Sequence, residues 1–176
     1  YIFVRTNGVW KQEAKIRAND AAAGNRFGQA VAIDGTTVLV GAPGGSKDTV
    51  YFFEKTGVDW LQKQSFDDAA LTNDDFGAAV ALSGSRAVVG KPSAPSGGEA
   101  VVFVRTTTWA VNATVRASDR QANEAFGTSV AILGTRVVVG APLLAIASLH
   151  AGTFAVSLLS MFAWLPWLLI ALPAGV

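Results

Sequence analysis

Four aspartates stand close together in this sequence, and such a group could do chemistry. They are Asp67, Asp68, Asp74 and Asp75. Neighbouring carboxylates can bind a metal ion or share acid–base work on a substrate such as a glycan. The equivalent stretches around Asp20 and Asp119 contain fewer acidic residues and also carry arginine. A functional site that belonged to these stretches should recur in each of them. We therefore favour a solvated loop over a catalytic or metal site.

Other reactive residue types are scarce. The chain has no cysteine and a single histidine, His150, so disulfides and cysteine-ligated zinc are excluded. No carboxylate near His150 in the sequence could orient it as a general base, and we predict a structural role for it. A net charge of +1 is too small for a nucleic-acid surface. We therefore expect no catalytic residue, no cofactor and no nucleic-acid partner.

A block of about fifty residues is repeated along the chain. Phe-Gly pairs begin at Phe27, Phe76 and Phe126, so the copies lie 49 and 50 residues apart. Each copy continues through a small apolar stretch and a glycine turn to a Gly-x-Pro sequence, at residues 41–43, 90–92 and 140–142. Repeats of this length are typical of propellers, solenoids and arrays.

Each repeat predicts four antiparallel strands. In one copy they cover residues 27–33, 36–42, 48–56 and 59–67, with Asp34-Gly35 as the turn of the first hairpin. The first two strands are continuously apolar or small, which predicts burial on both faces. The fourth alternates polar and apolar residues, as an outer strand does. Four such strands describe a propeller blade, and the fold class is all-β.

Three tryptophans occupy the same place in the repeat. Trp10, Trp60 and Trp109 each stand at the start of a predicted outer strand. A row of aromatic faces could stack on sugars, but this repeated position favours packing between strands.

The blocks resemble the FG-GAP repeat, the unit of integrin α-chain propellers and of many extracellular proteins. The resemblance rests on Phe-Gly, Gly-x-Pro and tryptophan recurring in phase over residues 1–142, and Lys91 departs from it by replacing the alanine of Gly-Ala-Pro. It implies a propeller fold, an extracellular or cell-surface location, and binding of a protein or glycan through inter-blade loops.

Metal-binding members of the family carry an Asp-x-Asp-x-Asp-Gly loop between Phe-Gly and Gly-Ala-Pro. This chain has only short turns there, at residues 34–36, 83–85 and 133–135. Such a turn cannot supply the roughly six oxygen ligands that Ca²⁺ requires. We predict no calcium in these blades.

The predicted strands make about three blade equivalents, whereas propellers usually close with roughly four to eight blades. The chain begins with the last two strands of one blade and reaches residue 142 with the first two strands of another. We expect an open or partial propeller, part of a larger ring, or one chain of an oligomer.

Residues 143–176 form an uncharged hydrophobic tail after the repeat domain, residues 1–142. Residues 154–172 are long enough for a membrane-spanning helix and also resemble a cleaved lipid-anchor signal. Residues 151–156 resemble residues 98–103, so the tail could instead complete the last blade, and a misread end of the coding sequence is a third alternative.

The sequence therefore predicts a cell-surface, adhesion-like binding module that is not an enzyme. Two alternatives stay open. One is a structural part of a larger assembly, joined through blade edges, because exposed strand edges invite pairing. The other is a glycan-active enzyme that uses Asp67, Asp68, Asp74 and Asp75.

Overall fold

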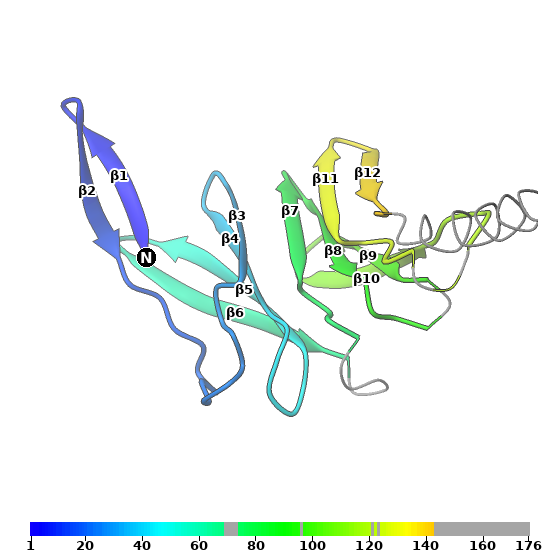
Figure 1. Cartoon of the computed structure of the whole chain (residues 1–176). Helices are drawn as coiled ribbons and strands as arrows, with labels where there is room; N and C mark the ends of the chain where they lie inside the picture. The colour runs from blue at the N-terminus through cyan, green and yellow to red at the C-terminus, as the bar shows by residue number, and fades with distance from the viewer. Residues whose placement is uncertain (69–73, 96, 121, 123, 143–176) are drawn as a thin grey trace, which may run out of the picture. The chain divides into compact units, whose positions relative to one another are not determined.

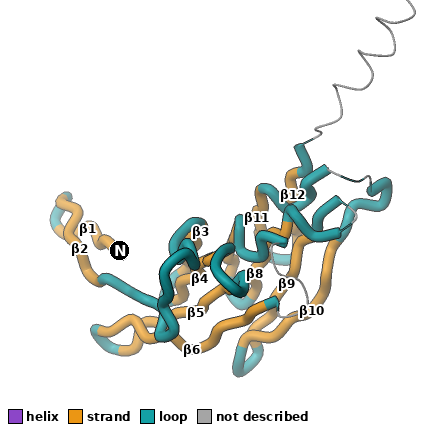
Figure 2. Tube along the Cα trace, turned by 60° about the horizontal axis from the view of Figure 1, so that its bottom comes forward, coloured by secondary structure: helices purple, strands orange, loops and turns teal. Residues whose placement is uncertain are grey.

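The computed structural model describes residues 1–68, 74–95, 97–120, 122 and 124–142 (Figure 1). Every regular element in this part of the chain is a strand (Figure 2). The twelve strands are β1 (Ile2–Thr6), β2 (Val9–Ala14), β3 (Ala30–Asp34), β4 (Thr37–Ala42), β5 (Thr49–Thr56), β6 (Asp59–Asp67), β7 (Ala79–Ser83), β8 (Arg86–Lys91), β9 (Glu99–Arg105), β10 (Trp109–Val115), β11 (Ser129–Leu133) and β12 (Arg136–Gly140).

The strands form four antiparallel sheets in chain order. Two sheets have four strands, β3-β4-β5-β6 and β7-β8-β9-β10, and two have two strands, β1-β2 and β11-β12. The predicted all-β class and the strand order within a blade are confirmed. The described strands do not form a closed propeller (Figure 1).

The inner hairpins follow from their turn residues. Gly35 adopts a φ of 56°, and Asp34 pairs with Thr37 across the turn. Glycine takes this left-handed conformation without steric cost. The prediction that the first strand starts at Phe27 is wrong, because Gly28 also has a positive φ, 92°, and β3 begins only at Ala30.

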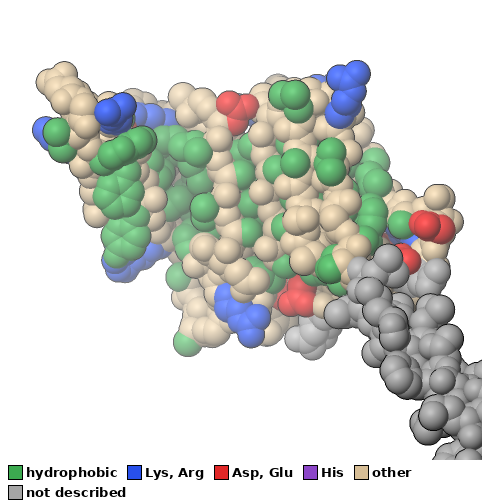
Figure 3. Space-filling model, turned by 45° about the horizontal axis from the view of Figure 1, so that its top comes forward, with side chains coloured by type: hydrophobic (Ala, Val, Ile, Leu, Met, Phe, Trp, Pro, Cys, Tyr) green, Lys and Arg blue, Asp and Glu red, His purple; other side chains and the backbone are tan. Residues whose placement is uncertain are grey.

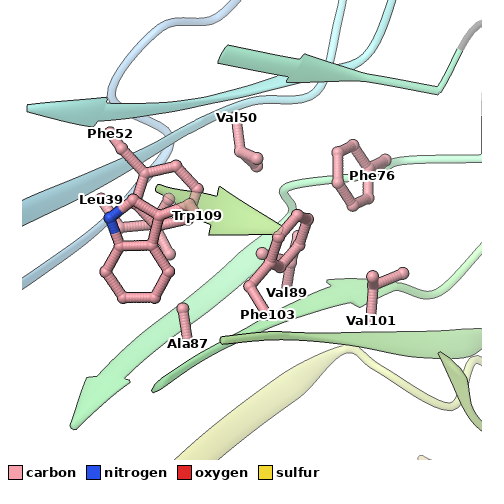
Figure 4. Packing of buried hydrophobic residues seen from close by; sticks show 9 residues of the cluster. All are labelled: Leu39, Val50, Phe52, Phe76, Ala87, Val89, Val101, Phe103 and Trp109. Carbon is pink, nitrogen blue, oxygen red and sulfur yellow. The ribbon is translucent and has the colours of Figure 1, made fainter. Parts of the chain in front are cut away.

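Consecutive sheets pack face to face through apolar side chains. The cluster between the two four-stranded sheets contains Leu39, Phe52, Phe103 and Trp109 together with smaller residues (Figure 4). A second cluster joins β1 and β2 to the first four-stranded sheet, and a third joins the second four-stranded sheet to β11 and β12. Each four-stranded sheet therefore contributes one face to the cluster before it and the other to the cluster after it.

A close backbone contact between sheets explains the recurring glycines. A Cβ built on Gly41 would lie 2.0 Å from the carbonyl oxygen of Gly77, and a Cβ on Gly90 would lie 2.0 Å from that of Gly127. Real Cβ atoms do not approach so closely, so only glycine fits the Gly-x-Pro position. The Phe-Gly of one sheet thus packs on the Gly-x-Pro of the sheet before it.

The inner strands are not all buried as predicted. All of β4 is buried, as expected. However, Val31 and Ile33 of β3 are 66% and 59% exposed. They point to the side of the sheet where β1 and β2 lie, and no described inner hairpin covers them there.

The chain divides into two units, Tyr1–Pro142 and Leu143–Val176. The second unit, with His150 and the predicted membrane segment 154–172, lies outside the described residues, so the expectations for it stay predictions. Within the described part of the chain, no helix is long and apolar enough to cross a membrane.

Candidate functional site

The four aspartates lie at the end of β6 and in the connection that follows it, and lysines contact three of them. Lys47 Nζ lies 2.9 Å from Asp67 Oδ2. Lys91 Nζ forms ion pairs with Asp68 and, at 2.9 Å, with Asp74 Oδ2. The fourth, Asp75, accepts a hydrogen bond from the Ser93 hydroxyl. The carboxylates are thus held by partners from the loop after β4, from the end of β8 and from the loop after β8.

The surroundings of Lys91 explain why a lysine replaces the alanine of Gly-Ala-Pro. It is the last residue of β8 and is only 5% exposed. Burial alone would lower the pKa of its ammonium, but the hydrogen bonds to Asp68 and Asp74 outweigh burial, and the pKa lies above its ordinary value. Lys91 therefore stays charged and balances the carboxylates around it.

Asp74 contradicts the prediction of a solvated loop. It is 2% exposed, and its Oδ1 accepts a hydrogen bond from the Phe76 amide at 3.1 Å. Burial raises its pKa, while Lys91 acts in the opposite direction. A buried Asp48 also holds this loop, because its Oδ2 accepts a hydrogen bond from the Asp75 amide at 2.9 Å. Asp74 is therefore a buried structural carboxylate.

A polar pocket of about 270 Å³ lies beside this cluster. The loop between β2 and β3, the loop between β4 and β5, and strands β5 and β6 form it. Its lining residues are Asp20, Ala22, Asn25, Ser46, Lys47, Thr49, Tyr51, Ser65 and Asp67. Carboxylates, an amide, hydroxyls and an ammonium meet there, so the polar pocket offers both hydrogen-bond donors and acceptors.

Two side chains give the polar pocket a defined electrostatic state. Burial, followed by its hydrogen bond with Asp20, raises the pKa of Tyr51 to about 12, so its hydroxyl stays protonated. The hydrogen bond from Lys47 lowers the pKa of Asp67. The pocket therefore presents a neutral phenol, a carboxylate and an ammonium at neutral pH.

Sequence reasoning found only part of this site. It named Asp67, used the stretch around Asp20 only as a comparison for the acidic loop, and assigned no role to Lys47 or Tyr51. The position of the β2–β3 loop in the repeat could have indicated the site, because this loop is the counterpart of the loop that carries Asp74 and Asp75 one repeat later. Only folding brings the β4–β5 loop beside it.

The predicted packing between strands is confirmed for Trp60 and Trp109 but not for Trp10. Trp109 is 2% exposed and stacks on Phe52, with ring centroids 4.4 Å apart and an interplanar angle of 18° (Figure 4). The Trp60 indole donates a hydrogen bond to Glu13 Oε2 at 3.1 Å. Trp10, in contrast, is 67% exposed. The three therefore do not form one platform for sugars.

Among the described residues, no group of three or more histidine, aspartate or glutamate side chains is arranged to hold a metal ion. The expectation of no calcium stays a prediction for the chain as a whole.

Repeated antiparallel sheets of four strands, each packed by its face on the next, are consistent with the blades of a β-propeller. A family model described as FG-GAP repeat matches residues 10–53 and 109–153, together half of the chain. The chain belongs to the FG-GAP repeat family. Repeats of this family are found in integrin-like adhesion and binding modules. No curated protein matches the chain.

Proposed function

We propose that this chain is an extracellular or cell-surface binding module that takes a polar ligand, from a protein or a glycan, through its inter-blade loops and performs no catalysis. The observation that carries the proposal is the polar pocket, whose lining comes from an inter-blade loop and the neighbouring β4–β5 loop. Membership of the FG-GAP repeat family supports it, because these repeats occur in adhesion and binding modules.

The size of the polar pocket sets the scale of the ligand group. At about 270 Å³ it is slightly smaller than the roughly 300–1,000 Å³ that small-molecule sites usually provide. It fits one sugar ring or one polar side chain of a protein partner. Affinity must then also come from contacts of the rest of the ligand with the loops around the pocket.

Charge pairing supports binding over glycan hydrolysis. Glycoside hydrolysis needs one protonated and one ionised carboxyl group on either side of the scissile bond. Asp67, Asp68 and Asp74 instead contact lysine ammonium groups. We propose that these aspartates order the loops and do not act on a substrate.

Binding to arrays of glycans and of cell-surface proteins tests this function, with Lys47→Ala as the informative variant. The Lys47–Asp67 pair is exposed, with side chains 59% and 42% accessible, so its loss should change stability little. A ligand of the polar pocket should bind this variant at least about tenfold more weakly, a change of about 1.4 kcal/mol.

Lys63→Ala is the matched control, because Lys63 is an exposed lysine on β6 outside the polar pocket. Equal affinity of the two variants for every ligand found would overturn the assignment of the pocket. Hydrolysis of a glycan that is lost in Asp67→Asn or Asp74→Asn, with the fold intact, would establish the enzyme instead.

A further inference from the structure

The N-terminal end of the described residues, here called the first end, exposes apolar side chains of β1 and β3 whose equivalents in the interior repeats are covered. Phe3 of β1 is 54% exposed, whereas its equivalents Phe53 and Phe103 are 2% and 0% exposed. Val31 and Ile33 of β3 are also exposed, whereas their equivalents in β7, Val80 and Leu82, pack against the central cluster. Hydrophobic side chains gather at this end in Figure 3.

An apolar groove of about 700 Å³ occupies this end. Tyr1, Phe3, Phe27, Val31 and Ile33 are among its lining residues. In the next blade, the hairpin of β3 and β4 covers the corresponding surface of β7. The groove therefore has the form of a seat for the inner hairpin of a blade.

The C-terminal end of the described residues, here called the last end, is the inner hairpin of β11 and β12, and the outer side of this hairpin is uncovered. Val138 of β12 is 68% exposed, whereas its equivalents Leu39 and Val88 are both fully buried. Among the described strands, β12 pairs only with β11, and β1 pairs only with β2. Each of these strands has an edge of backbone N–H and C=O groups that a further strand could pair with.

The glycine contact between blades shows the same complementarity. Gly41 packs on Gly77, and Gly90 packs on Gly127. A Cβ on Gly28, at the first end, would meet nothing within 4 Å, and a Cβ on Gly140, at the last end, would meet only Ser129 of its own hairpin. Each end thus has one half of the contact.

We propose that the two ends join between copies of this chain, with β11 and β12 of one copy completing the sheet of β1 and β2 in another. The partner's β12 then runs antiparallel to β1, as β4 does to β5 and β8 to β9. Its Val138 covers the groove beside Val31 and Ile33, and its Gly140 meets Gly28. The twelve described strands are three blades, so these strands of two copies make a ring of six, within the usual range of about four to eight.

Two-fold symmetry makes both junctions identical. The repeat defines their register. Thr37 pairs with Glu54 and Arg86 with Val104. The corresponding pair across the junction is Arg136 with Val4.

Disulfide formation at this pair tests the register. The Lys55 amide donates to the Thr36 carbonyl at 2.9 Å, so the next pair, Thr37 with Glu54, is a non-hydrogen-bonded pair. Cα atoms in such pairs lie about 4.5 Å apart. That distance falls within the range of about 4.4–6.8 Å that disulfides span.

The experiment mixes two single-cysteine variants of the full chain, Val4→Cys and Arg136→Cys, in mild oxidant. The native chain has no cysteine that could interfere, and both positions are exposed. The junction predicts a mixed disulfide dimer of these two variants. Val4→Cys mixed with Val58→Cys, at an exposed turn, is the control. A yield of mixed dimer no higher than in the control overturns the proposal. A second test uses one chain that carries both Val4→Cys and Arg136→Cys, and a disulfide formed within that single chain also overturns the proposal.

The mass of the native complex tests the ring. Light scattering on the full chain should give twice 18.3 kDa. Val31→Lys places a charge in the groove, where an isolated chain leaves it in water, and should reduce the mass to one chain with an unchanged circular dichroism spectrum. Val58→Lys should leave the mass at two chains. A single-chain mass for the native protein overturns the proposal. A series of larger masses overturns the closed ring of two copies.

Discussion

The substitution Lys91→Ala tests whether Lys91 is what makes a buried carboxylate tolerable in this fold. It introduces the alanine found at the equivalent positions Ala42 and Ala141. It also removes the ammonium that lies 2.9 Å from Asp74 Oδ2 and contacts Asp68. Asp74, 2% exposed, would keep its charge without its lysine partner.

The expected cost follows from that burial. Removing one partner of a buried ion pair costs about 3–5 kcal/mol, because the remaining charge stays desolvated. Folded domains are stable by only about 5–15 kcal/mol, so this loss is a large part of the total. Removing both charges, with Lys91→Ala and Asp74→Asn together, should recover at least about 2 kcal/mol of it.

The pH dependence carries a definite sign. Burial raises the pKa of Asp74 above the 3.8 of an unfolded carboxyl, so its protonation contributes stability below pH 3.8 that is lost as the pH rises through the folded pKa. Without Lys91 that pKa should rise further. The free energy of unfolding of Lys91→Ala should therefore approach that of the native chain as the pH falls from about 7 toward about 4.

Urea unfolding followed by far-ultraviolet circular dichroism measures these differences. Lys47→Ala, which breaks the exposed pair with Asp67, is the control and should change the free energy of unfolding little. The reasoning is refuted if Lys91→Ala costs no more than this control, or if adding Asp74→Asn restores nothing.

Two further substitutions test how the sheets pack. Gly90→Ala should cost more than about 3 kcal/mol, because its Cβ would lie 2.0 Å from a backbone carbonyl oxygen that cannot rotate away; an unchanged melting temperature would show that consecutive blades approach less closely. Trp109→Ala should cost about 3–5 kcal/mol through loss of the buried ring stacked on Phe52, whereas Leu61→Ala, at a 45% exposed position, should stay within about 0.5 kcal/mol; equal melting temperatures would contradict the role of Trp109 in the central cluster.

Local patterns in the sequence determined the strands and their order. The turn at Asp34-Gly35, the buried run of β4 and the alternation of β6 each depend on neighbouring residues, and the repeat confirms each pattern. The family follows from the same spacing, because Phe-Gly and Gly-x-Pro recur in phase. Here the glycines also have a physical reason that the sequence could not show, the contact of Gly41 with Gly77.

Only the tertiary structure decided which charges meet and which apolar faces stay uncovered. Lys91 looked like a departure from a motif until folding placed it between Asp68 and Asp74, more than fifteen residues earlier in the chain. The sequence did not reveal the exposure of Val31 and Ile33 either, because the partly buried Val80 and Leu82 at the equivalent positions are also apolar. Burial and ion pairing depend on which side chains the neighbouring sheet contributes, and the residues adjacent in sequence do not specify those side chains.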